Sequence, residues 1–228
     1  MTIDKIGGQT LSIIQNLREQ GIRKMSAIIR HSERNYDKEN PFREPFMNLT
    51  ENGKDASLQF GEQLPLGMLV RAFSSFIGRC IETAYLIDKG YTSKGGKTTI
   101  NVVEFFLSPF YAKNPAEILK AFVEGGSLGF VRRWLNGEFP SELIANPESS
   151  AKKIVGFAKE KLTESLEDHI DIFVSHDWNL YLVKEILLGL KHEDYGKVEY
   201  MEGVVLYSQN GDIYITHHQA EPRKLELN

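Results

Sequence analysis

Two apolar runs in the sequence each end in a histidine beside charged residues. The run 25–29 leads into Arg30-His31-Ser32-Glu33-Arg34, and the run 170–174 leads into Ser175-His176-Asp177. Guanidinium groups so close to a buried strand are expected to point toward an anion or toward solvent, since an unpaired buried charge costs several kcal/mol. Their forked donors match phosphate oxygens, and the positive charges are expected to lower the pKa of His31 and keep its imidazole nucleophilic. The alternative is a solvated basic turn.

A third cation follows another apolar run. Residues 68–73 predict a strand, and Arg79 comes shortly after it, in a predicted helix over 76–88. Functional groups in α/β proteins gather at the carboxyl ends of parallel strands, so Arg79 and the two histidines form one site if their strands are neighbours. Each residue also has a structural interpretation: Arg79 on an exposed helix face, and His176 as a histidine that only packs at a strand end.

The elements that must position these residues alternate between helical and strand patterns. Short connections join them, which favours an α/β layered fold. Thr50 can cap a helix that runs toward Leu64. Near the end of the chain, Asn210-Gly211 between the strand patterns 204–208 and 212–216 predicts a hairpin.

The middle of the chain is mostly helical. The segment 102–139 is rich in aromatic residues, and Pro115 suits a helix start. Ser149 or Ser150 can cap the helix that leads to the second histidine. Residues 90–97, with the sequence GYTSKGGK, are the most linker-like stretch, although it is too short to separate two domains convincingly.

Taken in order, these segments resemble the motifs of the histidine phosphatase superfamily, which contains the phosphoglycerate mutases and the histidine acid phosphatases. Arg30-His31-Ser32-Glu33-Arg34 resembles its Arg-His-Gly-x-Arg motif, with Ser32 in place of the usual glycine. Three further segments are similar to its Leu-Thr-x-x-Gly, Ser…Arg…Thr-Ala and His-Asp-x-Asn-Leu segments: Leu49-Thr50-Glu51-Asn52-Gly53, Ser74 or Ser75 with Arg79 and Thr83-Ala84, and His176-Asp177-Trp178-Asn179-Leu180. The matches span about residues 25–190, most of the chain.

The resemblance implies that His31 attacks phosphorus and becomes transiently phosphorylated. It also implies which side chains surround the phosphoryl oxygens: Arg30, Arg34, Arg79 and His176. The acid-phosphatase branch implies Asp177 as the proton donor, whereas the mutase-like branch has a glutamate at a position that corresponds to Glu104, 25 residues after Arg79. We favour Asp177, because a donor must reach the leaving oxygen and Glu104 also fits a surface or helix-start glutamate.

We expect a three-layer α/β fold, in which a central, mostly parallel sheet carries helices on both faces and a small helical cap. Residues 1–228 are expected to form one domain, with 100–147 as a cap insertion. The expected activity is metal-independent hydrolysis of a phosphomonoester through phospho-His31. The alternatives are phosphoglycerate-mutase-like transfer and a non-catalytic phosphate-binding module, which only Ser32 favours. With Asp177 as the donor, activity is expected to fall toward alkaline pH.

Composition bounds these interpretations. The 228 residues, 41% hydrophobic and 25% charged, are typical of a globular chain that buries a core without disulfides or structural metals. A net charge of −4 argues against a general nucleic-acid surface, and the single cysteine, Cys80, excludes a disulfide framework. The sequence has neither an apolar run of about 18 residues nor a secretion-type N-terminus, so we expect a cytoplasmic protein without a membrane partner.

No cofactor and no metal is expected. His217 and His218 are adjacent on a predicted strand, so they should point to opposite faces and be unable to hold one metal together. The expected partner is a small phosphorylated substrate, with sugar phosphates, nucleotides, inositol phosphates and phosphoproteins all open. The residues favour no particular oligomeric state.

Overall fold

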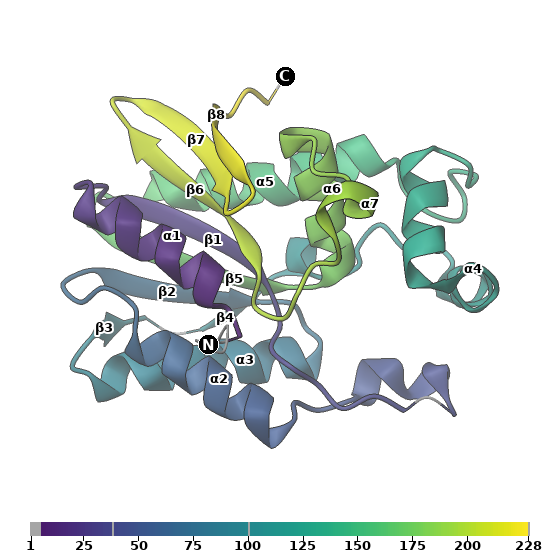
Figure 1. Ribbon diagram of the computed structural model, residues 1–228, viewed down its shortest axis with the longest axis horizontal. Coiled ribbons are helices and arrows are strands. Elements are labelled where there is room, and N and C mark those ends of the chain that lie inside the picture. Colours follow the sequence, from purple (N-terminus) through teal and green to yellow (C-terminus); the bar gives the residue numbers. More distant parts are fainter. Residues whose placement is uncertain (1–5, 38, 100, 228) are drawn as a thin grey trace.

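Among residues 6–37, 39–99 and 101–227, which the computed structural model describes, eight strands form one mixed sheet (Figure 1). The strands are β1 (Lys24–Arg30), β2 (Leu69–Ser74), β3 (Lys97–Thr98), β4 (Val102–Val103), β5 (His169–Ser175), β6 (Gly203–Gln209), β7 (Asp212–His217) and β8 (Ala220–Lys224). Their order is β3-β2-β5-β1-β6-β7-β8, and β4 also pairs with β2.

Helices surround this sheet. The α-helices are α1 (Gly8–Glu19), α2 (Glu51–Glu62), α3 (Gly78–Ser93), α4 (Pro115–Leu135), α5 (Pro147–Glu164), α6 (Asp177–Leu188) and α7 (His192–Tyr195), and the 3-10 helices are η1 (Pro41–Phe46) and η2 (Phe105–Leu107). In the part of the chain that the structure describes, no helix combines the length and apolar character needed to cross a membrane.

The centre of the sheet is parallel. Strand β5 lies between β1 and β2, with Arg30 opposite Ser175 and Ser74 opposite Val174. The carboxyl ends of these three strands therefore meet at one edge. On the other side of β1, β6 runs antiparallel and forms a hairpin with β7 at Asn210-Gly211, as predicted. The prediction of a mostly parallel central sheet is confirmed for this core.

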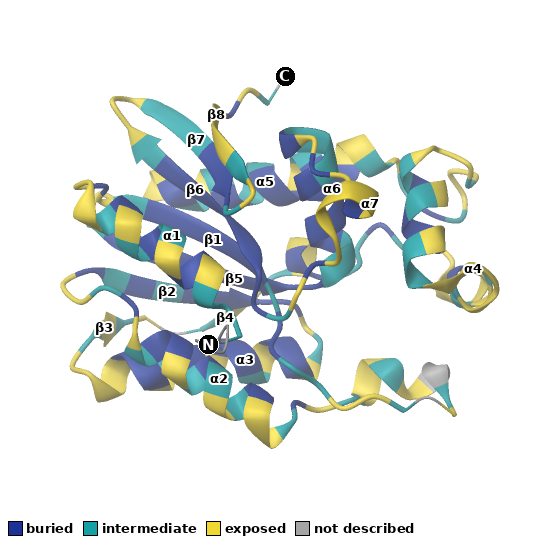
Figure 2. Cartoon of the chain, viewed as in Figure 1, coloured by how far each residue is buried: buried dark blue, intermediate teal, exposed yellow. Residues whose placement is uncertain are grey.

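The strands bury both of their faces, as the dark colouring of β1 and β5 shows (Figure 2). Alternate residues of β1, such as Met25 and Ile29, belong to the core packed by α1, α2 and α3. Ile28, between them, belongs to the opposite core, to which α4, α5 and α6 contribute. This period of two is what a strand requires when it is covered on both sides, and it confirms the layered α/β prediction.

Two local predictions about helix ends are wrong. Helix α3 continues through Ser93, so the first half of GYTSKGGK is helical rather than a linker. Gly90 lies inside that helix, and glycine is required there because α2 passes so close that an added Cβ would lie 2.0 Å from the Leu58 carbonyl oxygen. Helix α5 is capped by Asn146, whose side chain accepts a hydrogen bond from the Ser149 amide, instead of by a serine.

The helical region before α5 agrees better with the sequence. Helix α4 begins at Pro115, and its axis breaks at Gly126, which adopts φ 67°. Figure 1 shows α4 beside the main body, on the same side as the slate-blue segment that contains η1. Strand β8, which the sequence did not predict, is an exposed edge strand that contains Pro222. Proline is tolerated in an edge strand because it has no amide hydrogen to donate to a neighbouring strand.

Candidate active site

Three polar residues come together at the carboxyl edge of the parallel strands. His31 follows β1, Ser75 follows β2 and His176 follows β5. The His31 amide donates to the Ser175 carbonyl at 2.9 Å, and the two imidazole centroids lie 5.7 Å apart. The structure thus brings together two histidines that are 145 residues apart in the sequence.

The hydrogen bonds of His31 fix its tautomer. Nδ1 lies 2.7 Å from the Ser32 carbonyl oxygen, which can only accept, so Nδ1 carries the proton. Nε2 accepts from Nε of Arg79 at 2.9 Å and therefore holds the lone pair. Burial, followed by the charges of Arg79 and Arg30, holds the pKa of His31 well below 6.5. The imidazole is consequently neutral at physiological pH, with Nε2 facing the cations.

His176 is oriented through a chain of hydroxyl groups. Its Nε2 lies 2.9 Å from Ser75 Oγ, which accepts from the Ser108 hydroxyl and from the Ile77 amide. Ser75 thereby ties the His176 ring to Ser108 and to the backbone at Ile77. Nδ1 lies 3.5 Å from Nη2 of Arg79, and burial together with this guanidinium lowers the pKa of His176 to about 3.

A carboxylate that the sequence did not reveal lies among the arginines. Oε1 of Glu44, from η1, is 2.8 Å from Nη2 of Arg79 and 3.0 Å from Nη2 of Arg34. Nη1 of Arg79 also donates to the Glu44 carbonyl at 3.0 Å. One carboxylate oxygen therefore bridges two guanidinium groups beside His31, as an oxygen of a phosphoryl group would.

Arg30 completes the positive side of the site. Its Nη1 donates to the Val198 carbonyl at 2.7 Å, its Nη2 lies 3.2 Å from Asp177, and its guanidinium stacks on the Tyr200 ring at 4.3 Å. Among the described residues, the buried Nε atoms of Arg30 and Arg34 have no hydrogen-bond partner. A buried donor without a partner costs about 1–3 kcal/mol, which a bound anion would recover.

The two candidate proton donors differ in their surroundings. Asp177 begins α6, accepts from the Trp178 amide at 2.9 Å and contacts Arg30, so its carboxylate belongs to the cluster. The Glu104 amide donates to the Ser74 carbonyl at 2.8 Å, but in the described part of the chain the Glu104 carboxylate has no hydrogen bond or ion pair with the cluster. The structure thus brings Asp177 to the site and leaves Glu104 outside these contacts.

Ser32, which replaces the glycine of the related motif, has a structural role. Its hydroxyl donates to the Gly53 carbonyl at 2.8 Å, and its amide donates to Thr83 at 3.1 Å, so its side chain is tied to α2 instead of Nε2 of His31. Gly53 lets this helix approach, because an added Cβ would lie 2.1 Å from the Glu33 carbonyl oxygen. The loop that carries His31 is therefore fixed from behind by α2 and α3.

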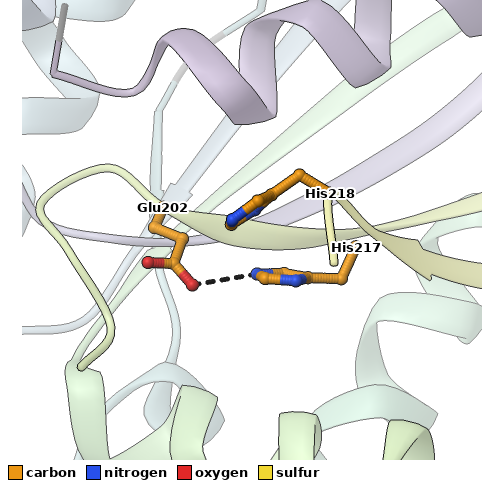
Figure 3. Close-up of side chains that lie close together, drawn as sticks. All are labelled: Glu202, His217 and His218. Carbon is orange, nitrogen blue, oxygen red and sulfur yellow. Dashed lines mark hydrogen bonds and ion pairs between the residues drawn. The ribbon is translucent and has the colours of Figure 1, made fainter. Parts of the chain in front are cut away.

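Outside this site, Glu202, His217 and His218 place ligand atoms within 4.8 Å of one another (Figure 3). The prediction that the two histidines point apart is wrong, because β7 has a register shift after Ile215 and ends at His217, which leaves the rings 4.0 Å apart. His217 accepts from the Gln219 amide at Nδ1 and donates to Glu202 at 2.9 Å.

Among the described residues, two clusters could hold a metal, and existing contacts already bind the carboxylates of both. Lys184 lies 2.5 Å from the Glu202 oxygen that His217 also binds, and a metal would have to displace it. In the second group, Glu185, His192 and Glu193, both carboxylates bind the guanidinium of Arg132. Within the described ranges, neither group includes His31 or His176.

Comparisons with known proteins identify the fold. No family model and no curated protein matches the chain. A solved structure named mycobacterial hydrolase 1 is similar over 90% of this chain and 98% of its own, with 15% identity and a TM-score of 0.53. A mycobacterial glucosyl-3-phosphoglycerate phosphatase is similar over 88% of this chain and 96% of its own, with 14% identity and a TM-score of 0.52. At these identities, the likeness establishes a common fold.

Proposed function

We propose that this protein, which has the histidine phosphatase fold, is a phosphomonoester hydrolase that works through a phosphohistidine intermediate on His31. The observation that carries the proposal is the hydrogen bond from Nδ1 to the Ser32 carbonyl, since it leaves the lone pair on Nε2. That lone pair accepts from Nε of Arg79 in the free protein, and a phosphoryl group that binds Arg79 takes over this contact before Nε2 attacks phosphorus. Burial and the neighbouring cations keep the pKa of His31 well below 6.5, so this lone pair is available across the physiological range.

The phosphoryl oxygens are bound by Arg30, Arg34, Arg79 and His176. The bridging position of the Glu44 carboxylate between Arg34 and Arg79 supports this assignment, because it indicates where an anionic oxygen is stabilised. Nδ1 of His176 lies 3.5 Å from Nη2 of Arg79, so the His176 ring borders the same oxygen position. Phosphoryl transfer depends on in-line positioning and on stabilisation of developing charge, and three guanidinium groups supply both without a metal or a cofactor.

The reaction has two steps. In the first, Nε2 of His31 forms a bond to phosphorus while the ester P–O bond breaks, and the leaving oxygen takes a proton from Asp177. In the second, water attacks the phosphoramidate, Asp177 takes a proton from it, and the P–N bond breaks to release phosphate and restore His31. The contact of Asp177 with Arg30 supports this role over Glu104, because it holds the carboxyl group at the anion site.

Hydrolysis of p-nitrophenyl phosphate with EDTA present, from about pH 4 to about pH 9, tests the proposal. We expect wild-type activity to persist and His31→Ala to abolish it, whereas His218→Ala, a histidine outside the site, should retain it. Quenching the reaction in alkali, where the P–N bond survives, should reveal phosphate on the peptide that contains His31. Turnover by His31→Ala would refute the nucleophile. With a monophosphate that carries a second hydroxyl group as the substrate, formation of a phosphate isomer without phosphate release would favour the mutase-like alternative.

A further inference from the structure

An apolar cavity of about 260 Å³ lies next to the arginine cluster, between η1 and α4. Its wall on the side of the cluster includes Arg34 and Glu44, the pair joined at 3.0 Å. Most of the remaining wall is hydrophobic and comes from η1, α4 and α6: Pro45, Pro115, Ile118, Leu119, Phe122 and Trp178. The cavity therefore continues from the proposed phosphate site into hydrophobic surroundings.

The wall offers few hydrogen bonds to an occupant. Its polar side chains are Tyr36, which is 54% exposed, and the pair Arg34 and Glu44 at the phosphate site. In the described part of the chain, Nε of Arg34 is the unpartnered donor of that pair. The indole N–H of Trp178 is directed at Ser127, 3.4 Å away. A sugar or inositol placed here would lose hydrogen bonds from its hydroxyl groups to water and regain few, at about 1–3 kcal/mol for each unpaired group.

The cavity also lies beside the proposed phosphate site and not against the nucleophile. In-line attack by His31 requires the leaving oxygen to depart on the opposite side of phosphorus, and His31, Arg79 and His176 form no part of the cavity wall. Trp178 in the wall directly follows Asp177, the proposed proton donor, in the first turn of α6. Arg34 and Glu44 line the cavity and also hold the position proposed for a phosphoryl oxygen, so the alcohol part of a bound ester begins at the edge of the cavity.

We infer that this cavity binds the alcohol part of the substrate and that this part is aromatic or branched aliphatic. The inference rests on the proposed phosphatase function and narrows its substrate class, since it argues against sugar and inositol phosphates. The size agrees: a cavity of roughly 150 Å³ holds one benzene ring, so the cavity here accepts one ring with substituents. Two neighbouring aromatic rings in the wall, Phe122 from α4 and Trp178 from α6, have centroids 5.9 Å apart and provide a surface against which such a group packs.

Binding of three phosphonates to the wild-type protein, measured by calorimetry, tests the inference without any need for turnover. The probes are methylphosphonate, benzylphosphonate and 2,3-dihydroxypropylphosphonate, which share the anionic group and differ in what enters the cavity. We expect benzylphosphonate to bind at least about tenfold more tightly than the other two, given the apolar area that a phenyl ring buries. Equal or tighter binding of the dihydroxypropyl compound would overturn the inference.

A matched pair of variants on α4 locates the effect. Leu119→Asn places an amide in the cavity wall and should weaken benzylphosphonate binding at least about fivefold while methylphosphonate is unaffected. Val123→Asn, at a position 57% exposed on the same helix and outside the cavity, should change neither. Equal losses for both probes in Leu119→Asn would contradict the inference. Failure of all three phosphonates to bind would overturn the phosphate site itself, whereas binding without a benzyl preference would overturn only the subsite.

Discussion

Replacement of Glu44 by glutamine tests the charge balance of the site. A phosphoryl group can bind Arg34 and Arg79 only if it displaces the Glu44 carboxylate, which bridges them at 3.0 and 2.8 Å. Glutamine keeps the shape and one accepting oxygen but removes the negative charge that competes with phosphate. We therefore expect Glu44→Gln to bind inorganic phosphate and vanadate more tightly than the wild type does.

The structure sets the magnitude of this effect. Hydrogen bonds to charged groups contribute about 1.5–3 kcal/mol when buried, and exposed ion pairs contribute about 0.2–1 kcal/mol. The Glu44 side chain is 34% exposed, while Arg34 and Arg79 are nearly buried, so the two contacts together fall between these limits. Loss of about 1–2 kcal/mol of competition corresponds to a gain in phosphate affinity of about 5- to 30-fold.

Calorimetric titration with phosphate at low and at high salt measures this gain. The gap between wild type and Glu44→Gln should shrink at high salt, because the competing pairs are partly exposed. Asp37→Asn is the matched control, since it removes a negative charge from the same loop, where Asp37 pairs with Arg43 at 3.3 Å and not with the cluster. Weaker phosphate binding by Glu44→Gln, or an equal gain in Asp37→Asn, would refute the reasoning.

Three further predictions follow from contacts in and behind the site. Asp177→Asn should lower kcat for an alkyl phosphate by about 10²-fold or more. The loss should be smaller for p-nitrophenyl phosphate, whose leaving group needs no proton. Glu104→Gln should change either rate little, and the reverse order of the two variants would make Glu104 the donor. Because the pKa of His176 is lowered to about 3, the unfolded chain binds more protons than the folded chain below about pH 6.5, and this group contributes a loss of about 2 kcal/mol of stability between pH 7 and pH 5. Urea unfolding at both pH values measures the loss, and His176→Gln should reduce it by that amount while His31 keeps its own share. Gly53→Ala should lower the free energy of unfolding by about 1–3 kcal/mol in the same assay, because its Cβ would meet the Glu33 carbonyl. Gly156→Ala is the control, since an added Cβ there meets nothing within 4 Å. Equal losses in the two variants would contradict the packing argument.

The sequence predicts the parts of the site that follow strands. Each of the runs before His31, Arg79 and His176 is short, apolar and followed by charge, which is enough to indicate a buried strand and its carboxyl end. Their meeting depends on β5 lying between β1 and β2, and only the structure provides that pairing. Local periodicity carries no information about which strands are neighbours, so the resemblance to a family supplied the link.

Residues in irregular segments escaped prediction for a physical reason. Glu44 lies in a short 3-10 helix, and its partner Arg79 is 35 residues away, so no hydrophobic repeat marks its position. For His218, one irregularity in β7 changes which face a side chain occupies, and the sequence pattern assumes that the period of two continues. Both errors arise where backbone geometry departs from a regular element.

Charge compensation links the stability of the site to its binding. The three arginines at the carboxyl edge are largely buried, and Glu44 and Asp177 provide the negative charge that balances them in the free protein. A phosphate monoester brings close to two negative charges, so it can replace both contacts and leave the balance nearly unchanged. It follows that Glu44→Gln should bind phosphate more tightly and also unfold more easily, since the same lost carboxylate causes both effects. Tighter binding with undiminished stability would mean that Glu44 obstructs the site without balancing its charge.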